Sequence, residues 1–168
     1  LSTVPYQPGR DITTKWGDNK ANRSERYLAC VAWLDGKRPS LVMCRGYYTN
    51  AYVAAYDFDG QQLKLRWLHR SEKRGRGLYG EGAHSLSVAD VDGDGCDEII
   101  YGAAVLDNDG TLLHRTSWGH GDALHVSDLM PDRPGLEIFM IHEERGGADV
   151  RDARTGEILF HEDDNKDT

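Results

Sequence analysis

The sequence predicts an all-β fold, because short apolar runs alternate with turn residues along its length. Runs such as "SLVMCRGYY", "EIIYGAAVL" and "EIFMIHE" are rich in Val, Ile, Leu and Tyr, and Gly- and Asp-rich segments separate them. Strands that recur about every 8–12 residues are typical of sandwiches, barrels and propellers. No stretch of about a dozen residues keeps the apolar period of an amphipathic helix. We therefore expect strands and turns to build the chain.

Internal repetition narrows this expectation to a β-propeller. "HSLSVADV" (84–91) aligns with "DALHVSDL" (122–129), and each is followed by an acidic loop and an apolar strand. A second marker recurs in "AYDFDGQQL" (55–63), "VLDNDGTLL" (105–113) and "VRDARTGEIL" (150–159). The resulting unit of about 40–50 residues is the size of a four-stranded propeller blade.

The repeat length sets the expected domain organisation. We expect residues 1–168 to hold about three to four blades of one propeller, with calcium loops between strands. Propellers close with at least about four blades, so we expect the chain to be an excerpt of a longer protein. The expected blade repeats lie roughly at 25–70, 80–120 and 121–165, with a linker or incomplete blade at 1–24. The Asp-Gly turns of these repeats predict hairpin rather than ligand roles for four aspartates, Asp57, Asp59, Asp107 and Asp109.

The charge balance excludes one class of partner. The chain has 20 Lys and Arg against 28 Asp and Glu, which gives a formal net charge of −8. Phosphate binding needs clustered Lys and Arg, so we do not expect nucleic acid as the partner. No apolar stretch approaches the roughly 18 residues of a membrane span, so no membrane partner is expected either.

The loop "DVDGDGCDE" (90–98) predicts a calcium site. Its carboxylates fall at alternate positions around a glycine, and Ca²⁺ binds six to eight hard oxygens in such loops. An EF-hand would need an acidic residue at the twelfth position and flanking helices, but Tyr101 stands there and the flanks read as strands. The expected ligands are Asp90, Asp92, Asp94, the carbonyl of Cys96, and Glu98.

A second acidic loop, "DLMPDRPGLEI" (128–138), is a diverged copy of the first. It keeps Asp128, Asp132 and Glu137, but Met130 replaces the second carboxylate and the loop is one residue longer. A weaker metal site formed by these three acidic residues is one reading. The other is a turn held by its prolines and glycine.

A separate set of histidines and carboxylates predicts a second kind of metal site. His84 and Asp122 take equivalent repeat positions, at the entry of the same strand in successive units. In a propeller such entries lie on one rim near the axis. His120 lies close to Asp122 in the chain, and Glu143 leaves the end of a neighbouring strand. Convergence of His84, His120, Asp122 and Glu143 on one cation is one reading of this pattern, and unconnected polar residues of separate loops are the other.

Three arginines are candidate contacts for a polyanion. Arg74 and Arg76 belong to the basic loop "RSEKRGRG" (70–77), and Arg45 precedes "GYYTN"; a solvated hairpin tip is the alternative reading of the loop.

The chain has three cysteines, of which Cys30 and Cys44 flank a predicted hairpin. Three scattered cysteines form no disulfide framework, and we expect buried free thiols, with a Cys30–Cys44 bridge as the alternative.

The segments "RYLACVAWLDGKRPSLVMCRGYYTNAYVAAYDFDG", "GEGAHSLSVADVDGDGCDEIIYGAAVLDNDG" and "GHGDALHVSDLMPDRPGLEIFMIHEE" together resemble the rhamnogalacturonan lyases of polysaccharide lyase family 11. This resemblance implies an eight-bladed propeller, several bound Ca²⁺ ions and a secreted bacterial enzyme. It implies cleavage of rhamnogalacturonan I, the acidic plant cell-wall polysaccharide. It also implies that His84, His120, Asp122 and Glu143 match the functional metal site of the family.

The implied substrate sets the expected chemistry. The C5 proton of a 4-linked galacturonate is weakly acidic, and a cation on the carboxylate favours its removal in a β-elimination. Imidazole ligands alone would favour Zn²⁺ or Mn²⁺, whereas the resemblance implies Ca²⁺, with Mn²⁺ as a substitute. The resemblance places the residues that abstract the proton further along the chain, so we expect this stretch to hold the metal but to be incomplete for activity.

Two other functions remain open from the residues. A calcium-stabilised, non-enzymatic carbohydrate-binding or adhesion propeller would use the acidic loops for rigidity and would not need the His84, His120, Asp122 and Glu143 set. A metal hydrolase would yield saturated rather than unsaturated products. The product formed from rhamnogalacturonan distinguishes the three.

Overall fold

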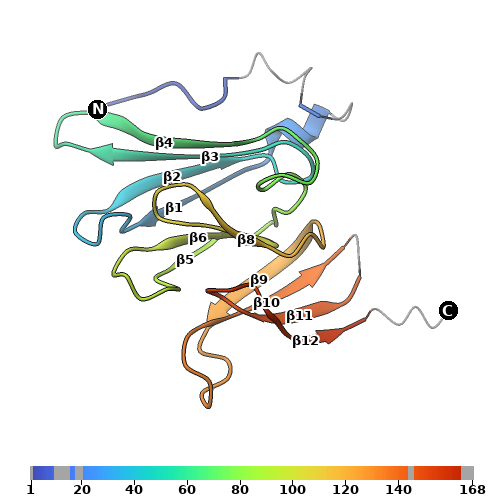
Figure 1. The fold of residues 1–168 in the computed structure, drawn as a ribbon. Coiled ribbons are helices and arrows are strands. Elements are labelled where there is room, and N and C mark those ends of the chain that lie inside the picture. The colour runs from blue at the N-terminus through green and yellow to red at the C-terminus, as the bar shows by residue number, and fades with distance from the viewer. Residues whose placement is uncertain (1, 10–15, 18–20, 144–145, 164–168) are drawn as a thin grey trace.

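The computed structural model describes residues 2–9, 16–17, 21–143 and 146–163 (Figure 1). Within these residues the chain forms three four-stranded antiparallel sheets and one short 3-10 helix, η2 (Ala21–Glu25). Sheet 1 holds β1 (Tyr27–Ala32), β2 (Ser40–Arg45), β3 (Ala51–Phe58) and β4 (Leu63–Ser71). Sheet 2 holds β5 (Ser87–Ala89), β6 (Glu98–Tyr101), β7 (Ala104–Leu106) and β8 (Leu112–Arg115). Sheet 3 holds β9 (Gly121–Ser127), β10 (Glu137–His142), β11 (Ala148–Asp152) and β12 (Ile158–Glu162). The predicted all-β fold is confirmed.

Each sheet is a simple meander, in which every strand pairs with the next one in the chain. Figure 1 shows the sheets stacked face to face, from sheet 1 through sheet 2 to sheet 3. The first strands are neighbours, since β1 contacts β5 and β5 contacts β9. Equivalent ends of successive sheets therefore lie side by side, which places the loops at those ends near one another.

Apolar side chains fill both interfaces of the stack. Ile99 and Leu106 of sheet 2 face sheet 1 and pack in one buried cluster with Val42 and Val53. Ile100 belongs to a second cluster, with Ile138 and Met140 of sheet 3. Sheet 2 is thus buried on both faces, which explains why β6 and β7 read as continuous apolar runs rather than as alternating strands.

The repeat markers take the same place in every sheet, at the hairpin between the third and fourth strands. The Asp59 carboxylate accepts the backbone N–H of Gln61 and Gln62, at 2.9 Å each, and Gly60 has φ of 94°. In sheet 2, the Asp109 carboxylate accepts the Thr111 N–H at 2.8 Å. The predicted turn roles of Asp59 and Asp109 are confirmed.

The described part of residues 1–24 packs against sheet 1. The Tyr6 hydroxyl donates to the Cys44 carbonyl at 2.8 Å, and Trp16 is buried, with its ring 4.8 Å from the Arg45 guanidinium. The remainder of this expected linker, residues 1, 10–15 and 18–20, lies outside the described residues. Among the described residues, no helix is long and apolar enough to span a bilayer.

The cysteines are free thiols, as predicted. Cys30 pairs in register with Val42, and Cys44 pairs with Leu28. The two thiols therefore lie two residues out of register on the paired strands β1 and β2, rather than directly opposite each other.

Candidate metal centre

Two neighbouring sheets bring the predicted histidines and carboxylates to one rim. Ala83 bridges Gly121 in parallel, and the His84 N–H donates to the Gly121 carbonyl at 3.3 Å. These contacts place His84, just before β5, beside the start of β9, where His120 and Asp122 stand. Glu143 follows β10, and its N–H donates to the His120 carbonyl at 3.0 Å.

Three of the four side chains form one close group, and the fourth, Glu143, approaches His120. Ligand atoms of His84, His120 and Asp122 all lie within 4.8 Å of one another. The distance from His84 Nε2 to Asp122 Oδ1 is 3.7 Å, and that from His120 Nε2 to Glu143 Oε2 is also 3.7 Å. The structure thus brings together all four residues that the sequence singled out for this site.

The environment of His120 fits a metal ligand. Its Nδ1 lies 2.6 Å from the Gly82 carbonyl, which can only accept, so Nδ1 carries the proton and Nε2 holds a lone pair. Nε2 is buried and has no hydrogen-bond partner among the described residues. Burial lowers the pKa of His120 to about 4, so the ring is neutral at ordinary pH. A buried lone pair beside carboxylates is the donor arrangement that a metal ion would fit.

Two tyrosines complete the site, and the sequence reasoning missed them. The Tyr47 ring stacks on His120 with centroids 5.0 Å apart and an interplanar angle of 6°, and its hydroxyl lies 3.3 Å from His84 Nδ1. The Tyr48 hydroxyl lies 3.2 Å from His84 Nε2. Both follow the second strand of sheet 1, as Glu143 follows the second strand of sheet 3. Aligning sheet 1 with the other repeats would have found them.

A pocket of about 580 Å³ opens beside Tyr48. Arg74 lines it, whereas Arg76, also exposed on the same loop, is outside its lining. The expectation that Arg45 contacts substrate is corrected by its position. Arg45 is 1% exposed, and its guanidinium donates to the carbonyls of Ser24, Pro8 and Gly9, so it anchors the N-terminal segment instead.

The first acidic loop, which joins β5 to β6, gathers three of the predicted ligands. Ligand oxygens of Asp90, Asp92 and Asp94 lie within 4.8 Å of one another, and Asp94 accepts the Cys96 N–H at 2.7 Å. Glu98, the first residue of β6, is fully buried.

The carboxylate of Glu98 lies in surroundings that a positive charge would stabilise. Its Oε2 accepts the Val91 N–H at 2.8 Å, while its buried Oε1 has no hydrogen-bond partner among the described residues. Burial, and then the charges of Asp92, Asp107 and Asp94, raises the pKa of Glu98 to about 7. A divalent cation among these oxygens would remove both penalties, so the residues present fit Ca²⁺. Asp107 has its predicted turn role, since it accepts the Asn108 N–H and its own N–H donates to the Thr111 carbonyl at 2.9 Å, and its charge also acts on Glu98.

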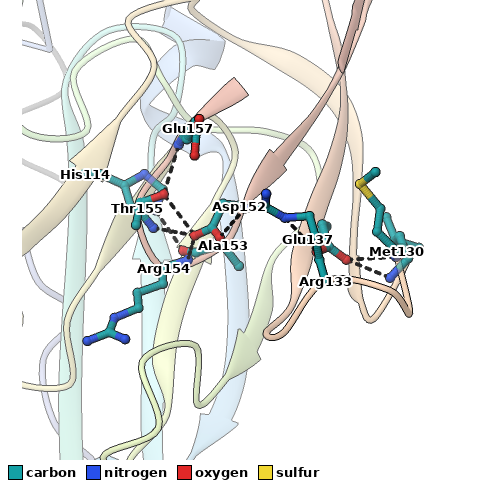
Figure 2. Close-up of polar contacts among 10 residues, drawn as sticks. His114, Met130, Arg133, Glu137, Asp152, Ala153, Arg154, Thr155 and Glu157 are labelled. Carbon is teal, nitrogen blue, oxygen red and sulfur yellow. Dashed lines mark hydrogen bonds and ion pairs between the residues drawn. The ribbon is translucent and has the colours of Figure 1, made fainter. Parts of the chain in front are cut away.

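The second acidic loop is built differently, and the structure does not bring Asp128, Asp132 and Glu137 together as metal ligands. Among the residues that the structure describes, the two groups gathered closely enough to hold an ion are the sets at His84 and at Asp90. Figure 2 shows what lies at Glu137 instead: Arg133 stands between Glu137 and Asp152. Arg133 Nη2 is 3.1 Å from Asp152 Oδ2, and Arg133 Nε is 4.0 Å from Glu137 Oε1.

Comparison with known proteins gives consistent matches. A family model described as "Rhamnogalacturonan lyase family 11, C-terminal domain" matches residues 1–168. The rhamnogalacturonan exolyase YesX of Bacillus subtilis (strain 168) is 57% identical over 164 residues, which cover 95% of this chain and 27% of YesX. The rhamnogalacturonan endolyase YesW of the same organism is 49% identical over 95% of this chain and 26% of its own length.

Solved structures agree. The crystal structure of the exotype lyase YesX superposes with a TM-score of 0.91 at 55% identity, covering 96% of this chain and 28% of that one. The Bacillus licheniformis rhamnogalacturonan lyase PL11 gives a TM-score of 0.90 at 53% identity, with the same coverage. The chain therefore spans about a quarter of the length of these relatives.

Proposed function

The chain belongs to rhamnogalacturonan lyase family 11, and we propose that the protein cleaves rhamnogalacturonan I of pectin by β-elimination at its 4-linked galacturonate. The observation that carries this proposal is the unpaired, buried Nε2 of His120, which faces His84, Asp122 and Glu143 beside an open pocket. Such a mixed site, open on one side, suits a cation that must also reach a substrate oxygen.

The chemistry assigns a role to each side chain. His84, His120, Asp122 and Glu143 would hold the cation, which we take to be Ca²⁺ with Mn²⁺ as a substitute. When bound, this cation would lower the energy of the negative charge that develops on the galacturonate carboxylate as the C5 proton leaves.

The supporting residues keep the ligands in place. The Gly82 carbonyl and the stacked ring of Tyr47 hold the His120 imidazole with Nε2 toward the site. The C4 oxygen leaves with the sugar chain attached to it, and the product is an unsaturated uronide. We assign no general base to this chain.

The fold proposed for the whole protein is an eight-bladed propeller, of which sheets 1 to 3 are consecutive blades. The contacts between the first strands β1, β5 and β9 support this, because the innermost strands of successive blades are neighbours around the axis. We also propose that the protein is secreted, because its proposed substrate is a plant cell-wall polysaccharide, which lies outside the cell that produces the enzyme.

The loop 90–98 is proposed to hold a structural Ca²⁺ that braces sheet 2 against sheet 1. The Trp33 N–H donates to Asp97 at 2.7 Å, so the loop is already tied to the β1–β2 hairpin. A Cβ added at Gly36 would lie 2.6 Å from the Gly95 carbonyl oxygen, which shows how closely the hairpin and the loop pack. An ion that fixes the loop would therefore fix the hairpin as well.

The test uses the full-length protein and rhamnogalacturonan I. We expect the ultraviolet absorbance of an unsaturated uronide to develop only when a divalent cation is present. His120→Ala should lower kcat/KM by about 100-fold or more. His125→Gln, which changes an exposed histidine of β9, serves as the matched control and should keep full activity.

Two outcomes would contradict the proposal. Saturated products would indicate a hydrolase. Binding of the polysaccharide without cleavage, with or without added cation, would indicate the carbohydrate-binding or adhesion propeller.

A further inference from the structure

We propose that the pocket beside Tyr48 is an acidic-sugar subsite, in which Arg74 recognises a uronate carboxylate. This inference rests on the proposed lyase function and adds to it the residue that selects the charged sugar. The pocket lies between the loop after β2, the loop after β4 and the segment after β8. Its volume, about 580 Å³, falls within the range of about 300–1,000 Å³ typical of small-molecule sites.

Tyr48 joins the pocket to the metal centre. Its hydroxyl is 3.2 Å from His84 Nε2, its ring centroid is 4.2 Å from that of His120, and it also lines the pocket. The Arg23 guanidinium lies 3.7 Å from the centroid of the same ring, which holds the ring in place. Gly119, also in the lining, directly precedes His120. A sugar in the pocket would therefore be bound next to the proposed cation.

The two arginines of the pocket differ in what they are free to do. Arg115 is held by the protein, with Nη2 at 2.8 Å from Glu81 Oε1, Nη1 at 3.1 Å from the Gly77 carbonyl and Nε at 3.0 Å from Ser117 Oγ. Arg74 is exposed and forms no ion pair with any residue in the described ranges. Its guanidinium fork is available for a carboxylate, with which it can form two parallel hydrogen bonds.

The rest of the lining suits the apolar faces of sugar rings. Tyr79 and Trp118 add aromatic surface to that of Tyr48. Trp118 is packed against His161 and His142, with ring centroids 4.6 Å and 5.4 Å apart, so its position is fixed. Rigid aromatic walls with one available guanidinium fit a ring that carries a single negative charge.

The test measures steady-state kinetics of the full-length protein on rhamnogalacturonan I oligosaccharides. Arg74→Gln should raise KM by about 10-fold to 100-fold, the effect of one charge-assisted hydrogen bond pair, with kcat changed by less than about 3-fold. The matched control is Arg38→Gln, whose side chain is 71% exposed in the β1–β2 hairpin, and it should leave KM unchanged. Trp118→Leu should also raise KM.

A chemically altered probe isolates the carboxylate. The same oligosaccharides with their uronate carboxylates reduced to alcohols should inhibit the wild type and Arg74→Gln equally weakly. Wild-type KM values in both Arg74→Gln and Trp118→Leu would overturn the inference while leaving the lyase proposal intact. If the wild type formed no unsaturated product, the lyase proposal would fail. Calorimetric binding of the unreduced oligosaccharide would then test the subsite by itself. Weaker binding in Arg74→Gln would support the subsite, and unchanged binding would overturn it.

An independent observation carries a second inference: Arg133 is a built-in cation that replaces the metal ion in sheet 3. Glu98 and Glu137 are the first residues of the second strands of their sheets. Each uses Oε2 to accept loop N–H groups, from Val91 in sheet 2 and from Leu129 and Met130 in sheet 3. The two loops differ in what faces the other oxygen.

In sheet 3 that oxygen lies 4.0 Å from Arg133 Nε, and since neither atom has a hydrogen-bond partner among the described residues, the two meet as an ion pair rather than as a hydrogen bond. The guanidinium also reaches Asp152, which pairs in register with Glu137. Asp128 and Asp132 are exposed to solvent and lie outside this cluster. Because an arginine is charged at every ordinary pH, its single positive charge offsets part of the negative charge of Glu137 and Asp152 without any metal.

Metal content by mass spectrometry tests this second inference on the full-length protein. Asp90→Asn should lose one calcium relative to the wild type, whereas Asp132→Asn and Asp128→Asn should lose none. A loss of calcium in Asp132→Asn or Asp128→Asn would overturn the inference. A full calcium content in Asp90→Asn would overturn the calcium assignment of the loop 90–98 and leave Arg133 untouched.

Discussion

The loops 90–98 and 128–137 lead into the same strand position of adjacent sheets, yet they balance their negative charge in different ways. In the first, the buried Glu98 carboxylate is surrounded by aspartates, and its pKa rises to about 7. In the second, the equally buried Glu137 carboxylate lies beside Arg133. The cation proposed for the first loop would come from solution, whereas the second loop has the Arg133 guanidinium beside its glutamate.

Sheet 1 shows a third solution at the same position. Ser40 replaces the glutamate at the start of β2, and its hydroxyl donates to Asp57 at 2.6 Å. Arg66 then lies 3.3 Å from the other Asp57 oxygen. The repeat thus keeps an acidic residue at the end of the third strand and varies its partners. At the start of the second strand, a Ca²⁺ dependence confined to sheet 2 follows. Three predictions test it, and a fourth tests the junction of sheets 2 and 3.

The largest effect is expected from removing the ion of sheet 2. Ca²⁺ at about 100 to 1,000 times its Kd adds roughly 3–4 kcal/mol of stability, which Glu98→Gln should forfeit because the buried ligand loses its charge. Thermal unfolding of the wild type and Glu98→Gln, both in saturating Ca²⁺, measures the effect, and hydrogen exchange should locate the amides loosened in Glu98→Gln in β5 and β6. Equal loosening of β10 would contradict the comparison.

Arg133→Met comes next. It leaves the Glu137 carboxylate buried without a cation, which should cost about 1–3 kcal/mol. Unlike the loss in sheet 2, this one should be the same at every Ca²⁺ concentration in denaturant unfolding. Arg154→Met is the matched control, because Figure 2 shows the Arg154 side chain directed away from this cluster. A Ca²⁺-dependent loss in Arg133→Met would mean that the loop binds an ion after all.

A smaller effect distinguishes Asp152 of sheet 3 from Asp107 of sheet 2, which lie at the ends of the third strands. Asp152→Asn can keep the turn, because its retained oxygen still accepts the N–H groups of Arg154 and Thr155. It loses only the ion pair with Arg133, worth about 0.5–1 kcal/mol. Asp107→Asn should instead weaken Ca²⁺ binding, measured by calorimetric titration. Identical responses of the two variants to Ca²⁺ would remove the distinction between the sheets.

The smallest effect concerns acid and the junction of sheets 2 and 3. His114 Nε2 lies 2.8 Å from the Ala153 carbonyl, and burial lowers the pKa of His114. The unfolded chain therefore binds this proton first, at about pH 6.5, so stability is full above that value and falls as the pH drops toward the folded pKa. His114→Gln should flatten this part of the stability curve, measured by denaturant unfolding between pH 5 and 7. An unchanged slope would contradict the assignment.

The parts of this molecule that local pattern determines were predictable from the sequence. The apolar runs and the Asp-Gly turns predicted the strands and hairpins of the sheets. The aligned repeats predicted that His84 and Asp122 lie at one rim. The remaining features depend on contacts between distant segments. Arg45 is buried because residues 8, 9 and 24 fold over it. Tyr47 reaches the site only because sheet 1 stacks on sheet 2, and composition does not reveal that Arg133 points inward.

Anomalous diffraction from crystals of the full-length protein soaked in Mn²⁺ tests the central claim most directly, because it locates each cation without reference to activity. The account predicts one peak among His84, His120, Asp122 and Glu143, a second within the loop 90–98, and none beside Glu137. A peak at Glu137, or no peak at His120, would contradict it.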